Sequence, residues 1–340
     1  MSAGSGLASA AQASPELAAA AVEMALAAAG LSRAGQVILL LTRDFDRQAR
    51  AAVVAAARAA GTLQVAGCTA SGLFTEAGPN PDQPAAAALV LAPATATSPP
   101  GDDDLRICFT GHARLPYGWQ SGGRRAGLQE SDALAWSAGR IAADSCAEIA
   151  LPGWRARPAH SPGLHPLGGD LTVDACDAYE LRQVEGVDAL GSLRAALPAE
   201  WRQAPPWHRL ALLRSPGRTG IAILSAGADG SLTLGEALSA GDTVRWALRD
   251  PAAAEREMRD ALTTAVDAGR PPEFALSFSC IGRGPLFYGG EDRDLQAFRD
   301  RCPGVPLLGA YGTGQIVPGR DGNLMYHNST LTLSYESLHV

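Results

Sequence analysis

The 340-residue chain contains no lysine, and all 28 of its basic residues are arginine. Several chemistries require a primary amine on the protein. They include the phosphate loop of nucleotide-binding proteins, Schiff bases with pyridoxal phosphate or an aldolase substrate, and proton abstraction by a lysine. The missing amine therefore excludes these three functions for this chain.

Clustered cysteines are also absent, since the sequence has no Cys-x-x-Cys pair. Zinc knuckles and disulfide frameworks show such close spacing. We interpret the cysteines as reduced thiols and expect neither a metal site nor a disulfide. The six are dispersed along the chain: Cys68, Cys108, Cys146, Cys176, Cys280 and Cys302.

No apolar run approaches the length of a membrane span, and the alanine-rich N-terminal segment carries Glu16 and Glu23 without a preceding basic region. The formal net charge of -7 argues against a surface that neutralises phosphates. We therefore expect a cytoplasmic protein with neither a membrane nor a nucleic acid as a partner.

The clearest local pattern lies near the C-terminus. An apolar run at 274–278 predicts a buried strand, a helical stripe follows at 294–302, and a second apolar run at 305–310 predicts another strand. The connection is long enough for a parallel crossover. The loops that follow the two strands, 280–288 and 311–315, should therefore lie at one edge of the sheet and face one crevice.

The N-terminal part repeats this order after a small, polar segment, 1–14, that we expect to be a disordered leader. Ser14-Pro15 starts a helix that ends at Gly30, and a strand is predicted at 37–42. A helix to about residue 60 and a strand at 63–68 follow.

The two parts match in sequence when 65–72 is laid on 307–314, which places Gly67 on Gly309. This match predicts an internal duplication. The expected fold is a mixed α/β (α+β) structure of two related strand-helix-strand units, joined by antiparallel strands.

The middle of the chain has a different character. A helix is predicted at 130–143, and the four prolines of 151–169 predict irregular structure. From residue 171 to 248, short alternating segments separated by turn residues predict antiparallel strands with one short helix. An amphipathic helix is predicted at 250–268.

Several of these segments resemble the signatures of FIST-domain proteins, sensory modules with an N-terminal and a C-terminal half. The resemblance extends over about residues 17–335. It is carried by Ser-Cys-Ile-Gly-Arg-Gly at 279–284, Pro-Leu-Leu-Gly-Ala-Tyr-Gly-Thr-Gly-Gln-Ile at 306–316, Leu-Met-Tyr-His-Asn-Ser-Thr at 324–330 and Val-Ala-Gly-Cys-Thr-Ala-Ser-Gly at 65–72.

The resemblance implies a FIST N-terminal-like unit at 15–104, connecting elements at 105–209 and a FIST C-terminal-like unit at 210–340. It also implies a small-molecule sensor in bacterial signal transduction, with an amino acid or related metabolite as ligand. Because the chain shows no output motif, we expect it to act in trans through a separate kinase or cyclase. One departure is Gln315, where the family usually has glutamate; an amide keeps the shape but loses the charge.

The predicted ligand site consists of the polar and aromatic side chains that the two strand-end loops and the last strand can present to one crevice. Arg283 would anchor an anionic group with its planar fork, although a structural arginine that binds loop carbonyls is the alternative. The predicted set is Ser279, Cys280, Arg283, Tyr311, Thr313, Gln315 and His327.

Two other functions stay open. The family resemblance also implies a nitric oxide sensor with non-covalent haem, for which His327, His112 and His165 are candidate axial ligands. The weakest alternative is an enzyme with Cys280 as nucleophile and His327 as its base, because no acylation motif accompanies the pair. A nucleotide loop is rejected, since Gly282-x-Gly284 lacks the third glycine of the dinucleotide fingerprint.

Overall fold

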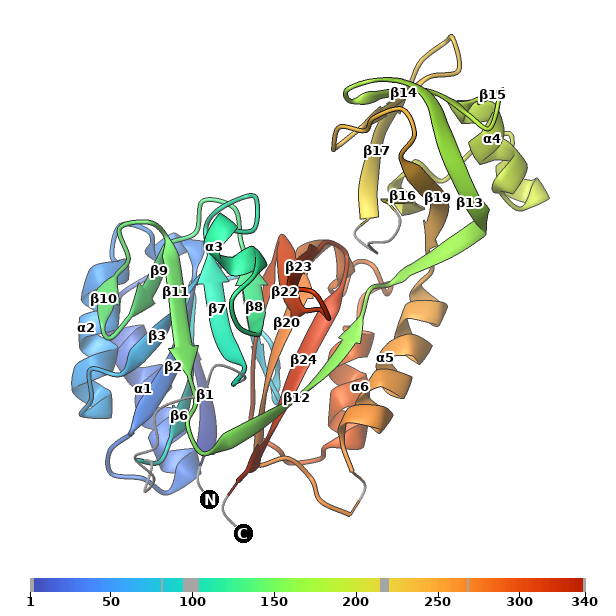
Figure 1. Ribbon diagram of the computed structural model, residues 1–340. Coiled ribbons are helices and arrows are strands. Elements are labelled where there is room, and N and C mark those ends of the chain that lie inside the picture. The colour runs from blue at the N-terminus through green and yellow to red at the C-terminus, as the bar shows by residue number, and fades with distance from the viewer. Residues whose placement is uncertain (1–2, 81, 94–103, 215–219, 268, 339–340) are drawn as a thin grey trace. The chain divides into compact units, whose positions relative to one another are not determined.

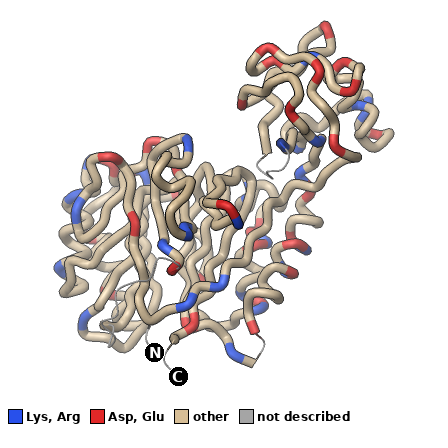
Figure 2. The backbone as a smooth tube through the Cα atoms, in the orientation of Figure 1, with Lys and Arg blue, Asp and Glu red and all other residues tan. Residues whose placement is uncertain are grey.

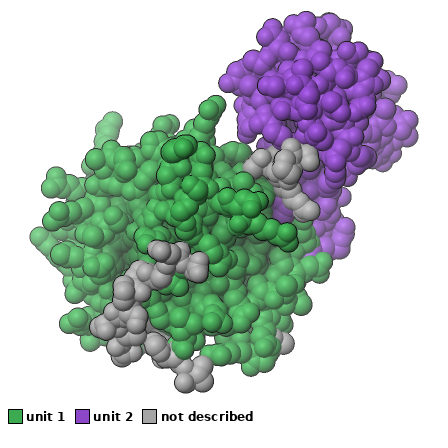
Figure 3. All heavy atoms as spheres, viewed as in Figure 1, with its two compact units in different colours: residues 1–161, 257–340 green, residues 162–256 purple. Residues whose placement is uncertain are grey.

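The computed structural model describes residues 3–80, 82–93, 104–214, 220–267 and 269–338. These residues form a mixed α/β fold with four sheets, which confirms the predicted class (Figure 1). Contacts divide the chain into two compact units, coloured separately in Figure 3. Unit 1 comprises Met1–Ser161 and Glu257–Val340, and unit 2 comprises Pro162–Arg256.

The first sheet of unit 1 is covered on its outer face by helices α1 (Pro15–Ala29) and α2 (Ala49–Ala60). Its central strands β2 and β3 run parallel, as the sequence predicts for a crossover connection, and the other neighbours pair antiparallel. A short 3-10 turn, η1 (Arg43–Phe45), follows β2. The strand order is β1 (Ala3–Ser9), β6 (Ala85–Leu91), β2 (Gln36–Thr42), β3 (Val65–Ala70), β9 (Ala135–Ser137) and β10 (Arg140–Ile141).

The second sheet of unit 1 has the same arrangement around the parallel pair β20 and β21, which confirms the predicted C-terminal crossover. Helices α5 (Pro251–Ala265) and α6 (Arg293–Arg301) supply side chains to the apolar cluster on its outer face, and η4 (Ile281–Arg283) follows β20. The order is β12 (Trp154–Ser161), β24 (Thr330–Ser337), β20 (Phe274–Cys280), β21 (Leu307–Gly312), β4 (Gly72–Thr75) and β5 (Gly78–Pro79).

The third sheet joins segments from both ends of the chain. Strands β7 and β8 are parallel, and β22 from the C-terminal part pairs with β8, just as β4 from the N-terminal part pairs with β21. The two halves of unit 1 are therefore interlocked through their sheets. The order is β11 (Cys146–Ala150), β7 (Arg106–Thr110), β8 (Arg125–Gln129), β22 (Gly314–Pro318) and β23 (Asn323–Tyr326), with α3 (Tyr117–Gln120) between β7 and β8.

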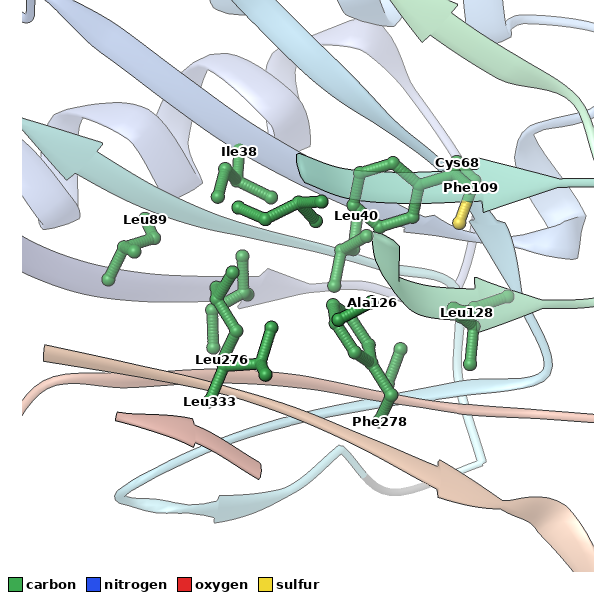
Figure 4. Close-up of a cluster of buried hydrophobic side chains, with 14 of the residues drawn as sticks. Ile38, Leu40, Cys68, Leu89, Phe109, Ala126, Leu128, Leu276, Phe278 and Leu333 are labelled. Atoms are coloured by element: carbon green, nitrogen blue, oxygen red, sulfur yellow. The ribbon is translucent and has the colours of Figure 1, made fainter. Parts of the chain in front are cut away.

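The core of unit 1 lies where the three sheets face one another (Figure 4). Successive side chains of a strand point to opposite faces, so Ile38 and Leu40 enter this central core while Leu39 packs against the helices. Phe278 of β20 and Phe109 of β7 meet edge to face in the same core, with ring centroids 5.9 Å apart. Burial on both faces thus explains why these strands are apolar at successive positions.

Unit 2 is a seven-stranded antiparallel sheet that closes on itself, because β13 pairs with both β19 and β14. These strands confirm the alternating segments predicted after residue 171. The order is β13 (Leu164–Asp177), β19 (Thr243–Arg249), β16 (Leu210–Arg214), β17 (Gly220–Ala226), β18 (Leu232–Leu234), β14 (Glu180–Val184) and β15 (Val187–Asp188). The helical elements are α4 (Ala189–Ala196), η2 (Ala199–Trp201) and η3 (Trp207–Arg209).

None of the described helices is both long and apolar enough to cross a membrane. Figure 2 shows arginine and acidic residues interspersed along the backbone of each of the two units.

Three sequence predictions are wrong. The leader at 1–14 contains strand β1; its small residues allow close packing, since a Cβ on Gly4 would lie 2.5 Å from the Ala25 carbonyl oxygen of α1. The helix at 130–143 is replaced by β9 and β10, which pair with β3 and with each other. The segment at 151–169, predicted to be irregular, forms β12 and the start of β13. Pro158 is tolerated because β12 is an edge strand, and Pro166 lies in the part of β13 that pairs, among the described strands, with β19 alone.

Gly67 provides a test of the parallel pairing of β2 with β3. Its φ is 156°, and a Cβ there would lie 1.7 Å from the carbonyl oxygen of Leu39 on the neighbouring strand. We expect Gly67→Ala to lower the free energy of unfolding by about 2 kcal/mol in urea titrations. At Gly30, which has a positive φ but no atom within 4 Å of the added Cβ, alanine should cost only about 1 kcal/mol. Equal losses of stability in the two variants would contradict the close approach of Gly67 to the carbonyl oxygen of Leu39.

Candidate functional site

Polar side chains gather where four strands of unit 1 end. Arg43 follows β2, Ser71 follows β3, Glu130 follows β8 and Thr313 follows β21. Hydrogen bonds connect these loops although they lie up to 184 residues apart in the chain. We call the group the strand-end cluster; it consists of Arg43, Ser71, Gln129, Glu130, Ser131, Thr313 and His327.

Glu130 forms the buried base of the strand-end cluster. Its side chain is only 3% exposed. Oε1 accepts hydrogen bonds from Ser71 Oγ at 2.9 Å and from Arg43 NH1 at 3.2 Å. Oε2 is buried and has no hydrogen-bond partner among the described residues. Burial raises the pKa of Glu130, while the bond from Ser71, the charge and bond of Arg43 and the nearby backbone N–H of Thr313 oppose this shift. An unsatisfied buried acceptor of this kind is a place where a ligand donor can bind.

Arg43 lies at the rim of the cluster. Its side chain is 39% exposed, so part of the guanidinium faces solvent while NH1 also donates to the carbonyl oxygen of Ser131 at 2.8 Å. The cluster therefore combines a partly exposed positive group with a buried carboxyl oxygen. This arrangement suits a ligand that carries both an anionic group and a donor.

Thr313 connects three of the sequence-predicted residues. Its Oγ1 donates to Gln129 Oε1 at 2.8 Å, and its carbonyl oxygen accepts from His327 Nδ1 at 2.7 Å. Because a carbonyl oxygen only accepts, Nδ1 carries a proton, and in the neutral ring Nε2 is then an acceptor. Cys280 Sγ donates to the same carbonyl oxygen at 3.7 Å. Thr313, His327 and Cys280 are therefore brought together.

Arg283 occupies a different environment, a fully buried network with no exposed surface. Its Nε and NH2 donate to Asp294 at 2.8 Å and 3.0 Å, and its NH1 and NH2 donate to the backbone oxygen and Oγ of Ser161 at 2.8 Å and 2.7 Å. Asp294 also accepts from Tyr288 and Thr330. The Arg283 guanidinium thus binds groups of the protein itself, which is the structural role given above as the alternative to ligand binding.

Ser279 and Tyr311 belong to the surroundings of this network. Ser279 Oγ and Thr330 Oγ1 are 2.9 Å apart. Tyr311 donates to Asp292 Oδ2 at 2.5 Å, and Asp292 in turn caps the first turn of α6 by accepting from two backbone N–H groups. Burial, with a further contribution from Asp294, raises the pKa of Asp292. Tyr311 thus connects β21 to the start of α6, and Ser279 connects β20 to β24.

Gln315 stands apart from both groups. It is fully buried, its Oε1 accepts from Ser329 Oγ at 2.8 Å, and its Nε2 has no hydrogen-bond partner among the described residues. The structure thus divides the seven predicted residues among three environments. Sequence reasoning missed Arg43, Ser71, Gln129, Glu130 and Ser131, and the available signal was a polar residue directly after a predicted strand, as at Arg43.

The candidate haem ligands lie in three different environments. His327 lies among polar strand ends, and its Nδ1 is bound to the carbonyl oxygen of Thr313. His112 Nε2 is 2.8 Å from the carbonyl oxygen of Asp144, and His165 lies in β13 of unit 2. In the enzyme alternative, the candidate nucleophile Cys280 donates to the same carbonyl oxygen that accepts from His327 Nδ1.

The raised pKa of Glu130 predicts a pH dependence of stability. Between the unfolded value near 4.5 and the raised folded value, the folded protein binds more protons than the unfolded chain. The contribution of Glu130 to the free energy of unfolding should therefore fall as pH rises through this window. Urea titrations at a series of pH values should show the fall for the wild type and a smaller fall for Glu130→Gln. Parallel curves for the two proteins would contradict the burial argument.

One family model and several relatives match parts of this chain. Residues 172–318 match the FIST C domain. An uncharacterized protein of Mycobacterium tuberculosis strain H37Rv is 29% identical over 220 residues, which cover 61% of this chain and 56% of that protein. An uncharacterized protein of Mycobacterium bovis is 30% identical over 224 residues, with the same two coverages. The match thus spans about half the length of these relatives.

Proposed function

Because residues 172–318 are a FIST C domain, a module associated with sensory and signalling roles, we propose that this protein is a small-molecule sensor whose ligand binds at the strand-end cluster. The observation that carries the proposal is Glu130, whose buried Oε2 has no partner among the described residues. Leaving a buried acceptor without a hydrogen bond costs about 1–3 kcal/mol, and a hydrogen bond from a ligand donor would recover that free energy.

The chemistry of the cluster favours an amino acid or a related metabolite. A ligand ammonium group would donate to Glu130 Oε2, and a ligand carboxylate would meet the partly exposed guanidinium of Arg43. His327 Nε2 offers a further acceptor. Arg283 has a supporting role in this proposal, because its fork is occupied by Asp294 and Ser161.

Thr313 and Ser71 support a further proposal, that the two halves of unit 1 arose by duplication. Leu39 is paired with Gly67 in β2 and β3, and Ser277 is paired with Gly309 at the matching place in β20 and β21. In this register Ser71 corresponds to Thr313, and both hydroxyls donate into the cluster. Sequence profiles built separately for the two halves should align with Gly67 on Gly309; any other register would contradict the duplication.

The signal would pass in trans to a separate output protein, for which a kinase or a cyclase is our proposal. A reconstituted assay should show that ligand binding changes the output activity. An output that responds equally to the wild type and to a variant without ligand binding would contradict this step.

A thermal-shift screen of amino acids and related metabolites tests the proposed function. A ligand at about a hundred times its dissociation constant stabilises the native state by about 2.7 kcal/mol. We expect the active compounds to carry both an amine and an anionic group. A screen in which compounds lacking the amine shift the melting temperature equally would contradict the role of Glu130.

A further inference from the structure

A groove of about 750 Å³ follows strand β12 on unit 1. Every residue of 154–160 contributes to its lining. Ala150 and Leu151, at the end of β11, and Ala261 and Ala265 of α5 line it as well. The small alanine side chains leave room beside the strand. The groove lies apart from the strand-end cluster, none of whose residues is part of its lining.

Strand β12 is the first strand in the order of its sheet, so one of its edges has no neighbouring strand among the described residues. Leu338 N donates to Gly153 O at 2.9 Å, which shows that Gly153 faces β24. Antiparallel pairs alternate along a ladder, so Trp154, Ala156 and Pro158 direct their backbone groups to the other edge. Trp154 N is bound to Leu151 O at 3.2 Å. The open edge therefore offers Ala156 N–H and the carbonyl oxygens of residues 154, 156 and 158.

The two faces of this edge differ in chemistry. Trp154 and Ala156 pack against the central core and give one face an apolar character. Arg155 and Arg157 project from the alternate face, and both are exposed. Arg157 Nε pairs with Glu336 of β24 at 2.9 Å, so Arg155 supplies most of the charge that this face offers to a partner. Arg124 adds a third exposed arginine to the lining, against one acidic residue there, Asp104.

We propose that this groove binds an extended segment of a partner protein that adds a strand to β12 and that alternates acidic and apolar residues. The backbone of such a segment would pair with Ala156, as in other complexes formed by strand addition. Its acidic side chains would lie on the face of Arg155 and Arg157, and its apolar side chains on the face of Trp154. Positive charges on an edge strand disfavour pairing with a second copy of β12, so the complementary partner is an acidic segment.

Fluorescence anisotropy with a labelled heptapeptide of alternating glutamate and valine tests the proposal. We expect Arg155→Glu to weaken binding of this peptide about tenfold, because a favourable charge becomes repulsive. Arg50→Glu, which reverses an exposed arginine on α2 outside the groove, should leave the affinity unchanged. A peptide of the same composition with its glutamates and valines in two blocks should bind weakly, since it cannot present one chemistry to each face.

Hydrogen exchange separates strand addition from a purely electrostatic contact. The alternating peptide should slow exchange of the Ala156 amide, whose N–H would join the new ladder. Ala156→Pro removes this donor without removing a bond to β24, and it should weaken binding as well. The proposal is overturned if the wild type does not bind the alternating peptide, if the block peptide or Arg155→Glu binds equally well, or if binding leaves exchange at Ala156 unchanged.

Discussion

Replacing Arg283 with alanine is expected to lower the free energy of unfolding by about 3–5 kcal/mol, because the substitution leaves a buried carboxylate without its cation. Asp294, the partner, has a side chain that is only 3% exposed. The bonds from Tyr288 and Thr330 to Asp294 remain in the variant, but they do not supply the lost positive charge. Urea denaturation measures the difference.

Arg259→Ala is the matched control for this measurement. Arg259 also forms an ion pair at 2.8 Å, with Asp300, but its side chain is 39% exposed and that of Asp300 is 46% exposed. Exposed pairs typically contribute about 0–1 kcal/mol, so this variant should stay close to the wild type. If Arg283→Ala lost no more stability than Arg259→Ala, the buried network would not have the structural role that its contacts indicate.

The second large effect is expected at Glu130. Once the screen has identified a ligand, Glu130→Gln should weaken its binding about 100-fold, which corresponds to about 2.7 kcal/mol. The amide keeps the size of the side chain and can still accept from Ser71. It removes the negative charge that would face the ligand ammonium group. Isothermal titration calorimetry measures the change.

Glu148→Gln is the control for a general effect of charge. Glu148 pairs with Arg125 at 2.9 Å in the third sheet of unit 1, and among the described residues none of its hydrogen bonds joins the strand-end cluster. This variant should bind the ligand with wild-type affinity. Equal binding by Glu130→Gln and the wild type would remove Glu130 from the ligand site.

Local sequence patterns predict those elements of the fold that depend on local burial. Apolar runs identify β2 and β20, and a proline at the start with a glycine after the end identifies α1, because burial and capping act over a few residues. The prediction of a helix at 130–143 fails because the conformation of this segment depends on a partner that is distant in the sequence. Trp136 lies opposite Gly67, so β9 depends on β3 for its ladder partner.

The candidate site was harder to predict for the same reason. Thr313 and His327 follow recognisable strands near the C-terminus and could be proposed as neighbours. Glu130 meets Arg43 across 87 residues, and the contact depends on how the sheets of unit 1 interlock. No periodic pattern encodes that arrangement. Arg283 illustrates the opposite error, since its buried partner Asp294 lies only 11 residues away at the start of a helix.

A crystal structure of the complex with a compound from the thermal-shift screen tests the central claim most directly. The account predicts electron density for the ligand among Arg43, Glu130, Thr313 and His327, with its amine nitrogen within about 3.2 Å of Glu130 Oε2. Density for the ligand in another part of the protein, with Glu130 Oε2 still lacking a partner, would contradict the account.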